Sequence, residues 1–152
     1  MESLSEVLAD LRYRVAEIER RFRNSNRTGT IKSEEDIDAA KGLVRVTLAD
    51  KDGKPYKTGW LPWNEQSAGA AKTHFPPSKD QQVRVRSQNG DLTDGEVELS
   101  TPSDTNTRSS QRGDEYDLIK VGKTLIRVTD GGAKLIIQVG DSKLELTEGV
   151  VK

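Results

Sequence analysis

The chain has no cysteine and only one histidine, His74, among its 152 residues. Without cysteine it can form no disulfide, present no thiolate nucleophile and bind no metal through sulfur. One histidine cannot build a histidine-based metal site within a single chain, and no nucleophile–histidine–acid arrangement can be recognised around it. The sequence therefore predicts a non-enzymatic protein without cofactor or metal, in which His74 is an ordinary loop residue.

Apolar residues are also scarce, and they form no long runs. They make up 32% of the chain, against about 45–50% in an average domain. Either part of the chain is disordered, or much of its apolar surface is buried against other copies or partners. No run approaches the roughly 18 residues that span a bilayer. The N-terminus MESLSEVLADLRYR lacks a signal-peptide pattern, so we expect synthesis in a cytoplasm.

The charges are almost balanced, with 24 basic and 25 acidic residues. This balance gives no general attraction to nucleic acid or to an anionic membrane. One local exception, RRFRNSNRTGTIK (20–32), contains several basic residues and no acid. It is either a nucleic-acid patch or favourable charge at the end of a helix. The few aromatic residues in the extended runs argue against the first interpretation.

Residues 3–23 are predicted to form a helix with a narrow apolar seam. The apolar residues follow a spacing of 4, 3, 4, 3, 4, which is a heptad a/d pattern. These residues are Leu4, Leu8, Leu11, Val15, Ile18 and Phe22. Arg14 and Glu19 stand where parallel helices could pair them. The segment is therefore either an amphipathic helix capping its own domain or a short parallel coiled coil.

Residues 27–100 change to the period-two pattern of strands. Val44, Val46 and Leu48 share one face, and a turn is expected at Asp52–Gly53 before a second extended run. QQVRVRSQNGDLTDGEVELS (81–100) repeats this arrangement around an Asn89–Gly90 turn. About five short strands in such a length fit an OB-fold barrel.

The remainder of the chain is a polar stretch followed by short apolar runs. Residues 101–113 are predicted to be a polar linker. In 114–152 the runs recur about every 8–10 residues and are broken at Gly122, Gly131–Gly132, Gly140 and Gly149. Roughly 40 residues rarely form a stable core alone. The pattern therefore predicts a β-solenoid or an intertwined β-prism made by several chains.

Two acidic stretches have simple interpretations. SEEDIDAA (33–40) is expected to be a solvated turn, although paired carboxylates can act as acid and base. DKDGKPYK (50–57) resembles the start of a calcium loop but lacks its later ligands. We therefore expect a hairpin turn there.

Four segments follow one another in an order that resembles a known family. They are RTGTIKSEEDIDAAKGLVRVTLAD (27–50), TGWLPW (58–63), AGAAKTHFPPSKDQQVRV (68–85) and NGDLTDGEVELS (89–100). Together they resemble the baseplate assembly protein V family, the central spike of contractile phage tails. Related spikes occur in tailocins and type VI secretion systems. WLPW and GDLTDGEVEL at this separation are the most specific part of the resemblance.

The resemblance implies a homotrimer with an OB-fold barrel and a C-terminal triple-stranded β-helix needle. The N-terminal helix would dock on a baseplate hub protein or form a coiled coil. Pro62 should interrupt the strand, so Trp60 or Trp63 is expected to contact a neighbouring protomer or the hub. Alternatively, both rings fill the end of the barrel.

In such a needle, apolar side chains point toward a threefold axis, and hydrogen bonds between chains leave few free edges. The expected inward residues are Leu125, Leu135, Ile137, Val139, Leu144 and Leu146. The sequence does not decide which face of the strand points inward, because the apolar residues Leu135, Ile136 and Ile137 are adjacent. The family's histidine-bearing metal tip has no counterpart after His74, so we expect a naturally short spike whose point is a separate tip protein.

The expected domains are 1–26 (helix), 27–100 (OB barrel), 101–113 (linker) and 114–152 (needle), an all-β fold apart from the helix. The expected function is a structural one, in a virion tail baseplate that contacts the bacterial envelope during injection. Binding to nucleic acid is not expected. The alternative is a nucleic-acid-binding OB module with an oligomerisation tail.

Overall fold

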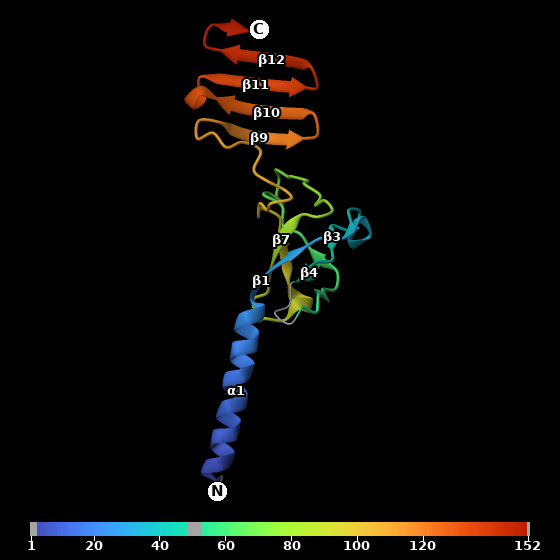
Figure 1. The fold of residues 1–152 in the computed structure, drawn as a ribbon, viewed down its shortest axis with the longest axis vertical. Helices are drawn as coiled ribbons and strands as arrows, with labels where there is room; N and C mark the ends of the chain where they lie inside the picture. Colours follow the sequence, from blue (N-terminus) through green and yellow to red (C-terminus); the bar gives the residue numbers. More distant parts are fainter. Residues whose placement is uncertain (1–2, 49–52, 152) are drawn as a thin grey trace. The chain divides into compact units, whose positions relative to one another are not determined.

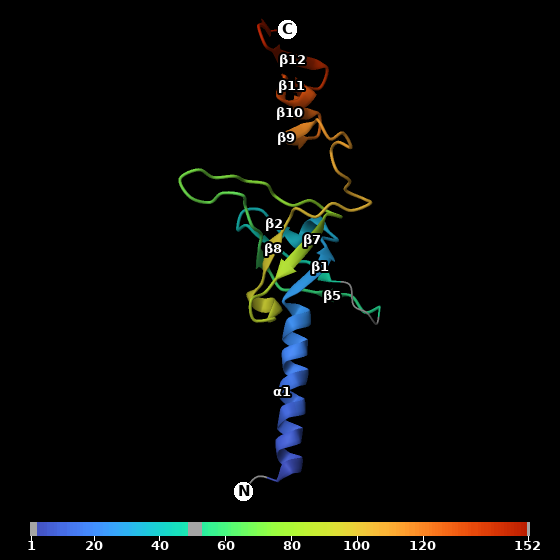
Figure 2. The same ribbon diagram turned by 90° about the vertical axis from the view of Figure 1, so that its left-hand side faces the viewer.

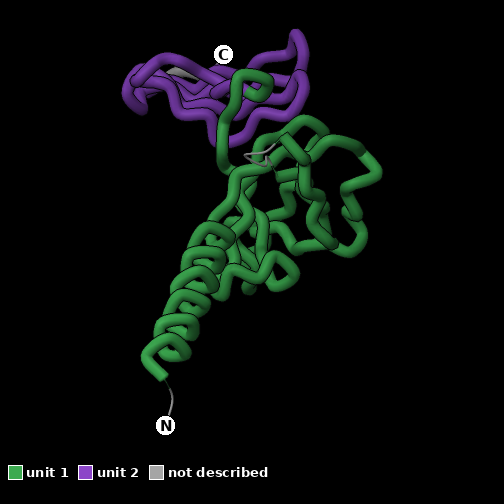
Figure 3. The backbone as a smooth tube through the Cα atoms, turned by 60° about the horizontal axis from the view of Figure 1, so that its bottom comes forward, with its two compact units in different colours: residues 1–106 green, residues 107–152 purple. Residues whose placement is uncertain are grey.

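The computed structural model describes residues 3–48 and 53–151 of the chain. The turn expected at Asp52–Gly53 and the start of the calcium-like stretch lie partly outside these residues. The chain divides into two compact units, residues 1–106 and 107–152, which Figure 3 colours separately. Each unit is described by itself.

The first unit begins with the single helix α1 (Leu4–Asn24), in agreement with the heptad pattern. Its N-cap, Ser3, forms a capping box with Glu6: the Glu6 amide donates to Ser3 Oγ at 3.3 Å, and the Ser3 amide donates to Glu6 Oε2 at 2.7 Å. The helix ends at Ser25, whose amide donates to the Phe22 carbonyl. No side chain of α1 is buried.

In the described residues of the first unit, eight short strands and two 3₁₀ turns follow the helix, and Figure 1 labels several of them. One sheet has the order β5-β4-β1-β7-β8 and a second has the order β2-β3-β6, all antiparallel. The bounds are β1 (Asn26–Thr30), η1 (Glu34–Asp36), β2 (Ile37–Asp38), β3 (Leu43–Val44), β4 (Thr47–Leu48), β5 (Tyr56–Lys57), β6 (Leu61–Pro62), β7 (Gln82–Arg86), η2 (Leu92–Asp94) and β8 (Glu96–Glu98).

The two sheets form one barrel because two strands bend from one sheet into the other. β3 runs into β4 across Arg45 and Val46, and β5 runs into β6 across residues 58–60. A parallel bridge between Trp63 and Val97 closes the barrel, and the Asn64 amide donates to the Val97 carbonyl at 2.8 Å. The period-two pattern thus leads to a barrel, as expected.

The barrel encloses a small apolar core. In β7, Val83 and Val85 are buried while Arg84 and Arg86 are exposed, which is the alternation that the sequence predicts. The buried apolar cluster consists of Ile31, Val44, Val46, Leu48, Leu61, Trp63, Val83, Val85 and Val97.

The second unit is one five-stranded antiparallel sheet in which each strand pairs with the next along the chain. Its glycines lie at the turns where the sequence predicts breaks. Figures 1 and 2 view this sheet from two perpendicular directions. The elements are β9 (Tyr116–Val121), β10 (Thr124–Thr129), η3 (Asp130–Gly132), β11 (Lys134–Val139), β12 (Ser142–Thr147) and β13 (Val150–Val151).

The strand register assigns the two faces of this sheet, which the sequence alone leaves ambiguous. Residues directly opposite in an antiparallel pair lie on the same face. Ile119, Ile126, Ile137 and Leu144 form one continuous row across β9 to β12. A neighbouring row joins Val128, Leu135 and Leu146 on that same face. We call the side with both rows the apolar face; it comprises Ile119, Val121, Ile126, Val128, Leu135, Ile137, Val139, Leu144 and Leu146.

Two expectations for this segment need correction. Leu125 pairs with Lys120 and Gln138, one position out of step with the apolar rows, so it lies on the opposite, mostly polar face. The main-chain hydrogen bonds expected between chains are made between consecutive strands of one chain. Within the described residues, the outer edges of β9 and β13 are left unpaired, and so is the part of β12 that the two-residue strand β13 does not reach.

Candidate functional site

The described residues contain no cluster of three or more histidine, cysteine or acidic side chains placed to hold a metal ion. Among the same residues, no helix has the length and apolarity to cross a membrane. The features that stand out are surfaces that fit contact with other proteins: the seam of α1, a corner of the barrel at Trp60, and the apolar face of the C-terminal sheet.

The predicted a/d residues of α1 are all exposed. Their exposed fractions run from 47% at Leu8 to 79% at Phe22. The full seam consists of Leu4, Leu8, Leu11, Val15, Ile18 and Phe22. The helix therefore does not cap the core of its own barrel, which was one of the two interpretations left open.

The corner of the barrel holds a buried carboxylate between two cations. Asp36 is 1% exposed, and its carboxylate forms an ion pair with Arg45 Nη2 at 2.9 Å and accepts hydrogen bonds from Lys57 Nζ at 2.9 and 3.0 Å. Arg45 and Lys57 belong to the two strands that bend between the sheets, and the Arg45 amide donates to the Asp36 carbonyl. The interpretation of 33–40 as a wholly solvated turn is therefore wrong at Asp36.

The two tryptophans occupy different environments, although only Leu61 and Pro62 separate them. Trp63 is 8% exposed and belongs to the core. Trp60 is 43% exposed, and the Arg45 guanidinium lies 4.5 Å from the centre of its ring. The alternative in which both rings fill the barrel is therefore wrong, because only Trp63 does so. The contact of Trp60 or Trp63 with a neighbouring protomer or the hub stays a prediction.

The segment after Trp63 is organised by Glu65. Its carboxylate accepts hydrogen bonds from Trp63 Nε1 at 2.9 Å, from the Phe75 amide at 2.8 Å and from Thr73 Oγ1 at 2.8 Å. The Trp63 hydrogen bond, followed by the other two, lowers the pKa of Glu65 below its ordinary value of 4.5. The exposed loop 66–74 is thereby tied to the core.

The arginines of the basic cluster in the last turns of α1 bind mainly other groups of the same helix. Arg20 and Arg21 both bind Glu17 at 2.8 Å, and these bonds lower the pKa of Glu17 to about 2. Arg23 Nε donates to the Glu19 carbonyl at 3.3 Å. These contacts support the helix-end interpretation of the cluster over a nucleic-acid patch.

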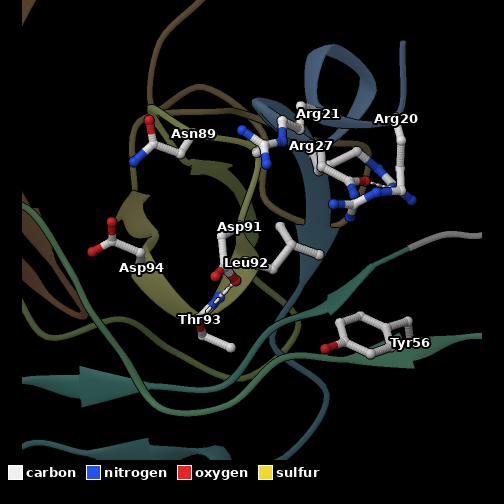
Figure 4. Close-up of a pocket in the computed structure, with 11 residues that line it drawn as sticks. Arg20, Arg21, Arg27, Tyr56, Asn89, Asp91, Leu92, Thr93 and Asp94 are labelled. Atoms are coloured by element: carbon white, nitrogen blue, oxygen red, sulfur yellow. Dashed lines mark hydrogen bonds between the residues drawn. The ribbon is translucent and has the colours of Figure 1, made fainter. Parts of the chain in front are cut away.

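Arg20 and Arg21, together with Arg27, border an open hollow of about 920 Å³. Figure 4 shows Arg20, Arg21 and Arg27 on one side of it and the turn from Asn89 to Asp94 on the other. Asp91 accepts hydrogen bonds from the Thr93 amide at 2.9 Å and from its hydroxyl at 2.7 Å. Charges of both signs line this hollow, so it has no clear preference for an anionic ligand.

The apolar face of the C-terminal sheet has no second layer in the described residues of its unit. Val139 is 59% exposed, Val121 62% and Ile137 36%, and Thr129 is the single buried residue among the described side chains of 107–149. The other face carries an ion network: Arg127 binds Asp117 at 2.5 Å and Glu115 at 2.9 Å. This network lowers the pKa of Asp117, chiefly through the Arg127 hydrogen bond.

A comparison with protein families identifies the barrel. The model of the type VI secretion system/phage-baseplate injector OB domain matches residues 27–99. Residues 27–99 belong to this family. The match covers the closed barrel from β1 to β8 and confirms the expected OB fold and the resemblance to baseplate protein V.

The injector OB domain gives the chain a structural role in a phage baseplate or a type VI injector, assembled with other tail components. No curated protein matches the chain. The corner at Asp36, Arg45 and Lys57 was missed from the sequence, and its one signal was Arg45 placed between the two core valines Val44 and Val46.

Proposed function

We propose that the protein is the homotrimeric central spike of a contractile phage tail or a related apparatus. It docks on a hub protein and helps to pierce the cell envelope mechanically. The observation that carries this proposal is the uncovered apolar face of the C-terminal sheet. The match of residues 27–99 to the injector OB domain supports the location in a baseplate.

A single-layer sheet with one apolar face must bury that face against something. Three copies related by a threefold axis can do so together, each supplying one side of a three-sided β needle. The row Ile126, Ile137 and Leu144 then points toward the axis. The polar face, with Arg127 and Asp117, faces the solvent.

This arrangement modifies the expected intertwined β-helix. Each chain keeps its own strand pairing, and the contact between chains is mainly side-chain packing. The outer edges of β9 and β13 can still pair with a neighbour, which would leave few free edges. A needle whose three chains must separate together unfolds slowly and can transmit an axial force.

Trp60 is the proposed contact of the barrel with the hub or a neighbouring protomer. The ring is half exposed and backed by Arg45, which Asp36 fixes in place. Tryptophan and arginine held in this way are common anchors of protein interfaces. Trp60→Ala should leave the barrel folded but weaken the assembly, whereas Trp63→Ala should unfold the barrel. The separate tip protein stays a prediction.

Adjacent isoleucines provide a matched test of the needle. Ile137 lies on the apolar face, and Ile136 lies on the other face opposite Arg127 and Glu145. Ile137→Lys should abolish the trimer in light scattering, because it would bury three lysines at the axis. Ile136→Lys should keep the trimer. If both variants keep the same mass as the wild type, the apolar face is not the interface and the proposal fails.

A further inference from the structure

The N-terminal helix, which belongs to the first unit, carries a second exposed apolar surface. We infer that the α1 helices of the three copies pair with each other, in parallel and in register, as a short coiled coil. The number of helices rests on the proposed trimer. The pairing itself rests on the contacts, exposure and charges of α1.

The barrel of the same chain does not cover the seam, because the last turn of α1 is held in place. The Ser87 amide donates to the Ser25 carbonyl at 2.9 Å. Gly90 has φ +68° and packs so closely that an added Cβ would lie 2.3 Å from the Arg21 carbonyl oxygen. To turn its seam onto the barrel, α1 would have to break these contacts. The seam therefore has no partner within the first unit.

The seam has the pattern that helices use to pair with their own copies. Its apolar residues repeat at heptad a and d positions along the whole helix, and a surface helix covering a globular core shows a wider stripe. In the heptad, Tyr13 lies at f, on the opposite side, and is 72% exposed. A second copy of the same helix presents a complementary seam, so no other kind of partner is needed to cover it.

The charges favour the parallel arrangement. Arg14 is at g and Glu19 at the following e, positions that meet between parallel helices. Arg14 now pairs with Asp10 on its own helix at 2.8 Å, but both side chains are more than half exposed, so the pair is weak and exchangeable. An antiparallel pair would instead face the g positions Arg14 and Arg21 toward g positions of the partner.

The end of the seam nearest the barrel has space for a neighbour. A hollow of about 330 Å³ lies beside Ile18 and Phe22 and is bordered by Gln88 and Asn89. In a parallel, in-register bundle, the Phe22 side chains of all copies lie at this level. Association here would hold the copies together independently of the C-terminal sheet.

The absence of cysteine makes a direct test possible. Leu11→Cys at d and Val15→Cys at a are made in the full chain, with Tyr13→Cys at f as the matched control. Each variant is treated with a short bis-maleimide at low protein concentration. The a and d variants should give covalent dimers roughly a hundredfold faster than the f variant, because the bundle raises the local thiol concentration to about millimolar.

Light scattering on the same variants separates this inference from the proposed function. Equal, slow cross-linking at all three positions in a particle of trimeric mass would overturn the coiled coil and leave the needle standing. Slow cross-linking together with a monomeric mass would overturn both. Fast cross-linking of Tyr13→Cys would also overturn the inference, because position f lies outside the interface that the heptad pattern predicts.

Discussion

The barrel and the C-terminal sheet solve the same problem, burial of apolar side chains, in opposite ways. The barrel bends two strands so that its sheets enclose Leu61, Val85 and their neighbours within one chain. The C-terminal strands form a single layer whose apolar face stays open. A low apolar content therefore does not mean weak folding throughout. It separates a region whose apolar side chains are buried within one chain from a region whose apolar face stays exposed.

Like the C-terminal sheet, α1 leaves its apolar side chains exposed. No side chain of its heptad seam, or of the rest of the helix, is buried. The injector OB domain thus carries an incomplete element on each side of it in the sequence. Four predictions follow from this contrast, in order of decreasing effect.

The largest expected effect separates a core residue from a residue of the apolar face. Leu61→Ala should cost about 2–5 kcal/mol of barrel stability, with a midpoint that does not depend on protein concentration. Leu135→Ala should instead lower a denaturation midpoint that depends on protein concentration in the variant and in the wild type, because unfolding of the sheet is coupled to dissociation. Denaturant titrations at two protein concentrations test this. If Leu135→Ala lost stability by an amount independent of protein concentration, the contrast between a core within one chain and an apolar face that contacts other chains would be contradicted.

The second prediction concerns the junction of α1 and the barrel. Gly90 and Gly42 both have φ +68°, but an added Cβ at Gly42 meets nothing within 4 Å. Gly42→Ala should cost about 1 kcal/mol through its backbone conformation alone. Gly90→Ala should cost about 2–4 kcal/mol, since it also clashes with Arg21. Equal thermal shifts in the two variants would mean that the junction is not tightly held.

The third prediction compares two neighbouring aspartates. Asp36→Asn leaves Arg45 and Lys57 without their buried counter-charge and should cost about 1–3 kcal/mol, reduced because both cations are partly solvated. Asp38→Asn removes an exposed pair with Lys41 at 3.6 Å and should cost less than about 0.5 kcal/mol. Chemical denaturation measures both. Similar losses would exclude a special role for the corner.

The smallest expected effect is a pH dependence from Glu65. The pKa of Glu65 is lowered in the folded protein, so its carboxylate stabilises the fold at pH values above the ordinary pKa of 4.5. This stabilisation is lost as the pH falls through the lowered pKa. The fluorescence of Trp63 should report the change. Glu65→Gln should be less stable than wild type at pH 7 and should approach it in acid. A difference that does not shrink in acid would contradict this role.

Much of the fold follows from local sequence pattern. The heptad of α1, the alternation in β7 and the glycines between the C-terminal strands each specify an element through nearby residues. The faces of the C-terminal sheet do not follow in this way, because Leu135, Ile136 and Ile137 are adjacent and pairing across strands decides which points inward. The placement of Leu125 on the polar face has the same cause.

The placement of the residues in the candidate site depends even more on contacts between residues far apart in the sequence. Asp36 is buried because Lys57, distant in sequence, reaches it from a bent strand. Trp60 and Trp63 diverge because they are three residues apart in an extended segment, where exposed and buried side chains alternate: Trp60 and Pro62 are exposed, and Leu61 and Trp63 are buried. This odd spacing puts the two rings on opposite faces, but only the closure of the barrel decides which face is buried.

The most direct measurement is the mass of the full chain in solution, by light scattering after size exclusion. The account predicts three times the 16.8 kDa of one chain, maintained on dilution. A monomer that keeps the β-sheet signal of the C-terminal unit would contradict it, because the apolar face would then be stable without a partner.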